Sequence, residues 1–218
     1  MKFENAYSGV KKIHAALILS MIATLVVGIA SFFGAMAIGA TGDALVNGSE
    51  DGAKGALIGA GLAGIFLIIG AVIALIAYII KIVGIGKAMK DEAAFKTAFI
   101  FIFVGLAASI LSAAFSGNAK VTQISNEVQS LCDLAVLYYI ITGIGNLADK
   151  LNNAAVKAKG KTVLKLIVCF YAIAIIAGIV GIFAETVAYI IAAVSSVLIV
   201  IALILYIAYL AQAKKMLA

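Results

Sequence analysis

The side chains that could take part in catalysis or metal binding are few and far apart in this sequence. His14 is the only histidine, and Cys132 and Cys169 are the only cysteines. General acid–base catalysis needs a titratable side chain with a positioned partner, and a structural metal site needs about four ligands. Neither set can be assembled here, so we predict no catalytic, cofactor-binding or metal site, and no enzymatic activity.

A glycine-rich stretch imitates a nucleotide-binding motif. Residues 59–64 read Gly-Ala-Gly-Leu-Ala-Gly, which has the spacing of the dinucleotide fingerprint. That fingerprint requires a preceding strand, whereas this stretch lies in a long apolar run, where small residues four apart let two helix backbones approach closely. We therefore interpret the small residues here and in the first apolar run as helix-packing positions: Gly55, Gly59, Ala60, Gly64, Ser31, Ala35 and Gly39.

Two acidic residues lie at the approach to the fourth apolar run. In residues 121–133, apolar side chains fall on one helical stripe and polar side chains on the other, which predicts a helix that begins outside the bilayer. Asp133 would then lie just inside the outer boundary, where an ionisable residue suggests a function. One hypothesis is that Glu127 and Asp133 line an outer vestibule. The alternative is that Asp133 only faces headgroups or water.

The elements that must position these residues follow from composition. Of 218 residues, 65% are hydrophobic and 12% are charged, whereas a soluble domain has roughly 45–50% and about 25%. So few charges cannot cover the surface of a globular protein of this length, so the chain must be solvated mostly by lipid. The sequence contains no Arg, Pro or Trp. Without arginine, the chain has no planar guanidinium group, which can bind a phosphate through two hydrogen bonds at once.

Apolar runs of about 20 residues predict transmembrane helices, because the hydrocarbon core is about 30 Å thick. We predict an all-α, polytopic membrane protein with six spans and no soluble domain. Residues 164–210 are too long for one span, so we expect a turn near Glu185. The spans are residues 13–38, 56–80, 97–116, 130–147, 164–184 and 187–210.

The distribution of lysine predicts the orientation. With the N-terminus inside, fourteen of the sixteen lysines lie in inner segments and only Lys54 and Lys120 lie outside. This bias predicts that both termini are cytoplasmic, and it explains the net charge of +6 without a nucleic-acid partner. We expect the inner lysines to contact anionic lipid headgroups. The candidates are Lys87, Lys90, Lys150, Lys157, Lys159 and Lys161.

A similar sequence at the junction between two apolar runs occurs twice in the chain. Gly-Ile-Gly occurs at residues 84–86 and 143–145, each time followed by a polar segment, Ala-Ala and another apolar run. We interpret this as three tandem hairpins, residues 1–83, 84–148 and 149–218, with a pseudo-threefold axis along the membrane normal. Chance similarity among apolar helices is the alternative. After the second junction, an apolar stripe through residues 144–155 predicts a helix at the inner membrane surface.

Three classes of function are compatible with this organisation. We favour a non-enzymatic packing subunit or scaffold of a bacterial plasma membrane that forms a homo-oligomer or binds another membrane protein, because small-residue faces are present and the loops are short. A channel or transporter for a small solute, with its vestibule near Glu127 and Asp133, is the alternative. It is disfavoured because charged residues are missing at mid-membrane. The hypothesis of an intramembrane enzyme has the least support, because no catalytic set of residues can be assembled.

Overall fold

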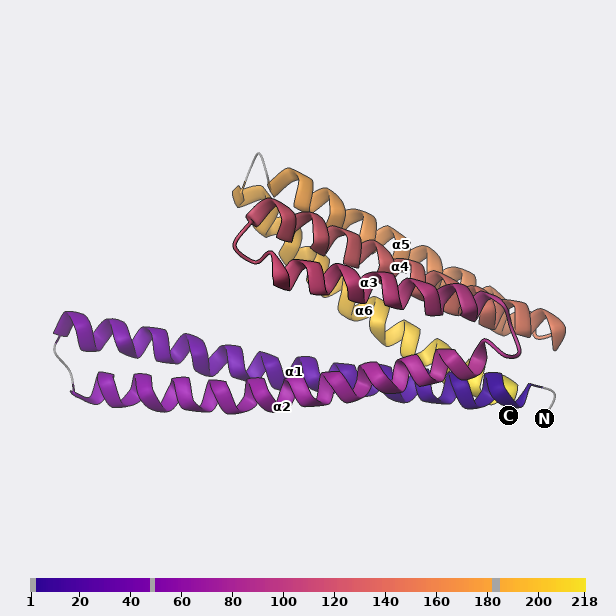
Figure 1. Cartoon of the computed structure of the whole chain (residues 1–218), viewed down its shortest axis with the longest axis horizontal. Coiled ribbons are helices and arrows are strands. Elements are labelled where there is room, and N and C mark those ends of the chain that lie inside the picture. The colour runs from indigo at the N-terminus through magenta and orange to yellow at the C-terminus, as the bar shows by residue number, and fades with distance from the viewer. Residues whose placement is uncertain (1–2, 48–49, 182–184) are drawn as a thin grey trace. The chain divides into compact units, whose positions relative to one another are not determined.

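The computed structural model describes residues 3–47, 50–181 and 185–218, and within these ranges the chain folds into six α-helices (Figure 1). The prediction of an all-α protein is thus confirmed. In chain order the helices are α1 (Glu4–Asn47), α2 (Glu50–Ala88), α3 (Ala94–Ala114), α4 (Ala119–Lys150), α5 (Ala154–Gly181) and α6 (Glu185–Leu217).

Among the described residues, five helices are long and apolar enough to cross a membrane, as expected for a membrane protein. They lie in α1, α2, α3, α4 and the second half of α6. Most helices extend beyond the predicted spans. The first one, for example, was predicted to end its span at residue 38 but continues to Asn47. A polar residue alone does not end a helix, and Asn47-Gly48 is the first strong turn signal after that span.

The contacts divide the chain into two compact units. Unit 2, Ala15–Lys81, contains most of α1 and α2. In this unit the two helices meet through small residues. A Cβ atom added at Gly70 would lie 2.7 Å from a methyl group of Val27, and one added at Gly59 would lie 3.0 Å from the Cβ of Ala37. The rings of Phe33 and Phe66 stack with their centroids 5.8 Å apart. Small side chains therefore bring the two backbones close together.

Unit 1 contains Met1–His14 and Ile82–Ala218. Within it α3 packs along α4, α5 packs along α6, and α4 also packs against α5. The core of unit 1 is built from bulky side chains that are almost completely buried, in contrast to the small residues between the helices of unit 2. The largest are Tyr209, Phe95, Ile85, Ile140, Ile144 and Leu147.

In this chain without proline, two adjacent asparagine residues end α4 and begin α5. Asn152 adopts a left-handed backbone with φ of 54°, and the N–H of Asn153 donates to the carbonyl of Ala148 at 2.8 Å, which closes α4 in a Schellman motif. The side chain of Asn153 then accepts a hydrogen bond from the N–H of Val156 and caps the start of α5. The predicted continuous surface helix through residues 144–155 is therefore wrong, because this turn interrupts it.

At the opposite ends of these helices, the structure describes the turn between α3 and α4 and part of the turn between α5 and α6. Asn118 caps α4 by accepting a hydrogen bond from the N–H of Val121, and Ser112 of α3 donates to the side chain of Asn126 at 3.0 Å. α4 does begin well before its apolar run, as the sequence predicted. The turn predicted near Glu185 coincides with the start of α6 at that residue, although residues 182–184 lie outside the described part.

Candidate functional site

Two adjacent acidic residues, Asp91 and Glu92, lie in the turn between α2 and α3 and bind two other segments of unit 1. Asp91 accepts hydrogen bonds at the start of α1. The donors are the N–H of Ala6 at 2.7 Å and the side-chain amide of Asn5 at 3.1 Å. The N–H groups of the first helical turn have no partner inside the helix, and the helix dipole is positive there. The Asp91 carboxylate is suited to that position on both counts.

The Glu92 carboxylate binds the end of α4. Lys150 Nζ donates to one carboxylate oxygen at 2.7 Å and the Asn146 amide donates to the other at 2.9 Å. Burial, which leaves only 9% of Glu92 exposed, disfavours its charged form. The two hydrogen bonds and the charge of Lys150 outweigh this effect, so the pKa of Glu92 lies below its ordinary value. Lys150 Nζ also lies 5.9 Å from the centre of the Phe3 ring, and this cation–π contact favours the charged form of the lysine.

The two Gly-Ile-Gly stretches have related surroundings in unit 1. Each lies near the end of a helix, α2 or α4, and each isoleucine is completely buried. The first glycine of each stretch faces the start of the preceding helix. A Cβ atom at Gly84 would lie 2.9 Å from the carbonyl oxygen of Gly9, and one at Gly143 would lie 2.8 Å from the ring of Phe95. Both stretches therefore let the start of one helix pack closely against the end of the next.

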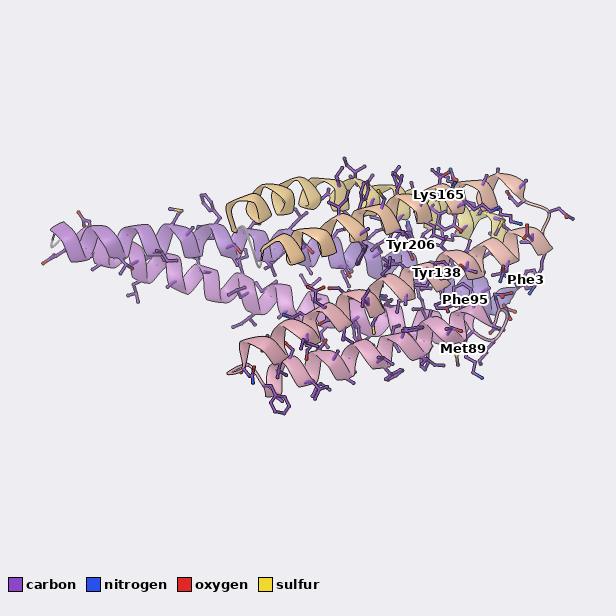
Figure 2. The ribbon with its side chains drawn as sticks, turned by 90° about the horizontal axis from the view of Figure 1, so that it is seen from above. Phe3, Met89, Phe95, Tyr138, Lys165 and Tyr206 are labelled. Atoms are coloured by element: carbon purple, nitrogen blue, oxygen red, sulfur yellow. The ribbon has the colours of Figure 1, made fainter. Side chains whose placement is uncertain are left out.

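A third contact of this kind joins α5 and α6 with the roles exchanged. Here the glycine, Gly160, is on the first helix, and Tyr209 is on the returning helix. A Cβ atom at Gly160 would lie 2.7 Å from the Tyr209 hydroxyl, which donates to the carbonyl of Ile141 at 3.4 Å. The starts of α1, α3 and α5 thus lie toward the same end of unit 1 as the ends of α2, α4 and α6, and Phe3 and Phe95 mark this end in Figure 2.

Some of the lysines predicted to contact lipid headgroups have partners within the chain, and others are exposed or half-buried. Lys150 and Lys157 form ion pairs, with Glu92 at 2.7 Å and with Asp149 at 2.6 Å. Lys87 is within 3.4 Å of the Ser8 hydroxyl. Lys90 and Lys161 are exposed, and Lys159 is half-buried. Lys157 and Lys161 also line an open pocket of about 470 Å³ at the start of α5, beside Asp149 and Asn153.

The predicted vestibule residues, Glu127 and Asp133, are both exposed on α4. They are six residues apart, so they project roughly 120° apart around the helix axis. They therefore do not lie side by side on α4, and the vestibule stays a prediction.

The predicted packing residues divide between the inside and the outside of unit 2. Gly59 is buried against Ala37 and the carbonyl of Phe33. Gly55 is exposed, but a Cβ built on it would lie 3.4 Å from the Cβ of Ala40. The others point outward or have open space: Ser31, Ala35, Gly39 and Ala60 are exposed, and no atom lies within 4 Å of a Cβ built at Gly39 or Gly64.

Apart from Gly59, most of the buried small residues that join α1 and α2 were not predicted from the sequence. Small residues recur at every seventh position of both helices, and this repeat was the available signal. Residues seven positions apart are about two turns apart, so they lie on the same side of a helix. The buried members in unit 2 are Ala16, Ala23, Ala30 and Ala37 on α1, and Ala63, Gly70 and Ala77 on α2.

The residues considered for catalysis remain separate. Cys132 is a buried free thiol, Cys169 is an exposed one, and His14 is half-buried. In the part of the chain that the structure describes, no three His, Cys, Asp or Glu side chains are grouped so that they could hold a metal ion. Comparisons of the chain with protein-family models, with curated proteins and with solved structures gave no match.

Proposed function

We propose that this chain is a non-enzymatic subunit of a bacterial plasma membrane that works by packing its first helix against another membrane helix. The observation that carries the proposal is a stripe of small residues on α1 that no described residue of unit 2 covers. We call it the α1 stripe, and its residues are spaced by three, four, four and three positions. They are Gly28, Ser31, Ala35, Gly39 and Gly42, all exposed.

The α1 stripe is open along its length. Apart from the backbone of α1 itself, no atom of the described residues lies within 4 Å of a Cβ built at Gly28, Gly39 or Gly42. In lipid, apolar burial does not drive helices together, so association depends on close backbone approach, which small residues allow. The hairpin partner of α1 uses a different face, the one that contains Ala30 and Ala37. The α1 stripe therefore supports packing against a second copy or another membrane protein.

Six spans in three tandem hairpins, residues 1–83, 84–148 and 149–218, with both termini in the cytoplasm, are part of the same proposal. Two observations support it. Fourteen of the sixteen lysines fall on one side of this topology. The helix starts and ends that carry most of these lysines are also joined within unit 1, through Asp91, Glu92 and the glycine contacts.

The lysine-rich side is proposed to face an anionic leaflet. Lys90, Lys159 and Lys161 have charged groups available for lipid phosphates, and each such lysine contributes about 1 kcal/mol of surface attraction. Lys150 and Lys157 contribute less, because each already has a carboxylate partner.

Native mass spectrometry of the protein extracted in its own lipid tests the association. We expect a fixed homo-oligomer or a complex with another membrane protein. Gly39→Leu, which adds a large side chain to the α1 stripe, should dissociate it. Gly61→Leu is the matched control, because Gly61 is also an exposed helical glycine with open space around it, but lies on α2. A monomer without a partner, or equal effects of the two substitutions, would contradict the proposal.

A further inference from the structure

The contacts between α3 and α4 relate each residue of α4 to a depth in the bilayer. α3 has 21 residues and is about 31 Å long, close to the hydrocarbon thickness of about 30 Å, and it lies alongside α4 (Figure 1). Near the end of α3, Ser112 donates to the side chain of Asn126, and near its start Phe95 lies against Gly143. In a bilayer that α3 spans, residues 126 and 143 of α4 therefore lie close to the two surfaces of the hydrocarbon core.

Asp133 lies between these two levels of α4. Its neighbour Cys132 packs against the middle of α3, because a Cβ atom built at Gly105 would lie 3.3 Å from the Cβ of Cys132. Along α4, Asp133 is about 10 Å from Asn126 and about 15 Å from Gly143. These contacts favour a deeper position than the one predicted from the sequence, where a span over residues 130–147 puts Asp133 just inside the outer boundary.

A row of polar side chains on α4 leads from the turn between α3 and α4 to this carboxyl group. Its members are spaced by four, four and three positions, so they lie within about 80° around the helix axis. We call them the polar row, and they are Thr122, Asn126, Ser130 and Asp133. Thr122 donates to the carbonyl of Phe115, and Ser130 donates to the carbonyl of Asn126. The polar row therefore brings a hydroxyl, an amide or a carboxyl group to each turn of α4 over about 16 Å.

The titratable groups that act on Asp133 come from its own helix and from α5. Asp133 interacts electrostatically with Cys132 of α4 and with Tyr171 of α5. The charged residues of the neighbouring helices lie further away along the helix axes. On α3 the only one is Lys96, about 13 Å from the level of Asp133, and on α5 the nearest is Lys165, about 9 Å from Tyr171. α6 carries no charged residue between its first residue and its last turn.

We propose that Asp133 binds a proton inside the membrane and exchanges it with water along the polar row. Asp133 is exposed on α4, and a carboxyl group in contact with hydrocarbon avoids the cost of its charge by holding a proton. Ionisable residues within spans commonly belong to proton pathways. The proton passes from water to a carboxylate oxygen and back, and no other bond changes. The proposal requires α3 to span the membrane, but it does not depend on the packing of the α1 stripe.

Dicyclohexylcarbodiimide tests the protonation, because this apolar reagent enters the bilayer and reacts with protonated carboxyl groups. The full chain is treated in lipid nanodiscs, and the adducts are located by mass spectrometry. The internal control is Glu127, which is also exposed on α4 but lies next to Asn126, near the surface of the hydrocarbon core. At pH 7 we expect Asp133 to react several-fold faster than Glu127, and its labelling to fall as the pH rises to 9. A water-soluble carbodiimide should instead prefer Glu127.

Infrared spectroscopy tests the exchange path. The carbonyl band of a protonated carboxyl group shifts in D₂O, and the band of Asp133 is the one that Asp133→Asn removes. Ser130→Val interrupts the polar row and should slow this shift several-fold. Thr24→Val is the matched control, because the hydroxyls of both residues donate to a carbonyl four positions earlier in their own helix, but Thr24 lies on α1. It should leave the rate unchanged.

Four results would overturn the proposal. They are equal labelling of Asp133 and Glu127 by the apolar reagent, labelling of Asp133 that does not change with pH, preference of the water-soluble reagent for Asp133, and an exchange rate in Ser130→Val equal to that of the unmodified protein. None of these results affects the association expected from the α1 stripe, so the two proposals fail separately.

Discussion

The Nζ atom of Lys150 lies 2.7 Å from a carboxylate oxygen of Glu92, and this contact joins the end of α4 to the turn between α2 and α3. Glu92 is 9% exposed, whereas Lys150 is 48% exposed. The carboxylate therefore depends on its two donors, while the lysine stays largely hydrated. Replacing the Glu92 carboxylate should therefore lower the free energy of unfolding moderately. Removing its charge should also change how the stability depends on pH.

Glu92→Gln is expected to lower the free energy of unfolding by about 1–2 kcal/mol at pH 7, because a hydrogen bond to a charged group is replaced by a neutral one. The folded-state pKa of Glu92 is depressed, so its contribution is fully present above the ordinary glutamate pKa of about 4.3. The contribution is lost as the pH falls through the lower, folded-state pKa. Denaturation in detergent from pH 7 to pH 3 should show the two proteins converging in acid.

Glu127→Gln is the control for this experiment, since it removes an exposed carboxylate from α4. Its stability should follow that of the unmodified protein across the same pH range. A constant difference between Glu92→Gln and the unmodified protein from pH 7 to pH 3 would show that the charge of Glu92 does not stabilise the fold.

Asp91→Ala removes the acceptor of the Ala6 N–H and should free the first turn of α1. We expect a loss of about 1 kcal/mol, the usual effect of deleting a helix cap. Hydrogen exchange should accelerate at Ala6 and its neighbours but not in α3. Lys90→Ala, a change at the adjacent exposed residue, should leave exchange at Ala6 unchanged. Equal protection of Ala6 in both variants would mean that the Asp91 carboxylate does not cap α1.

The helices were predictable because long apolar runs have one simple solution in lipid, where the backbone must satisfy its own hydrogen bonds. Their ends were harder. The apolar stripe predicts a helix that continues past Leu151, but Asn152 adopts the left-handed conformation and Asn153 caps the next helix. The periodicity of apolar residues alone does not predict that two adjacent asparagines can end one helix and begin another.

The polar contacts at the helix ends were not predictable from local pattern. Lys150 was assigned to lipid headgroups because it lies among other lysines, yet its partner Glu92 is 58 positions away in the sequence. A charge pair at this separation depends on how α3 and α4 pack, which spacing along one helix does not specify. The Gly-Ile-Gly repeat is evident in the sequence, but the partners of its glycines, Gly9 and Phe95, are defined only by the three-dimensional structure.

The asparagine pair itself gives a prediction with two opposite parts. Asn153→Ala removes the acceptor for the Val156 N–H and should destabilise the protein by about 1 kcal/mol. Asn152→Gly should be neutral or slightly stabilising, because glycine adopts a positive φ without steric cost. Unfolding of the two variants under the same detergent conditions checks both signs. Destabilisation by Asn152→Gly that equals that of Asn153→Ala would contradict the assigned turn.

Replacement of a helical glycine by alanine should have opposite effects at Gly9 and at Gly145. Alanine favours a helix over glycine by about 1 kcal/mol when nothing obstructs its methyl group. At Gly145 no atom lies within 4 Å of the added Cβ, so Gly145→Ala should stabilise the protein by about 0.5–1 kcal/mol. At Gly9 the Cβ would lie 2.5 Å from the Gly84 carbonyl oxygen and 2.7 Å from the Ala88 Cβ. Two helix backbones would have to separate, at a cost of about 1–3 kcal/mol.

The gain in helix propensity offsets part of that cost, so Gly9→Ala should destabilise the protein by up to about 2 kcal/mol net. Both glycines lie in unit 1, so the same unfolding measurement reports on both. Gly84→Ala provides an independent check, because its Cβ would lie 2.9 Å from the Gly9 carbonyl oxygen across the same contact. If Gly9→Ala and Gly145→Ala stabilise equally, α1 and α2 do not approach each other at Gly9 and Gly84, and the role assigned to the first Gly-Ile-Gly stretch is wrong.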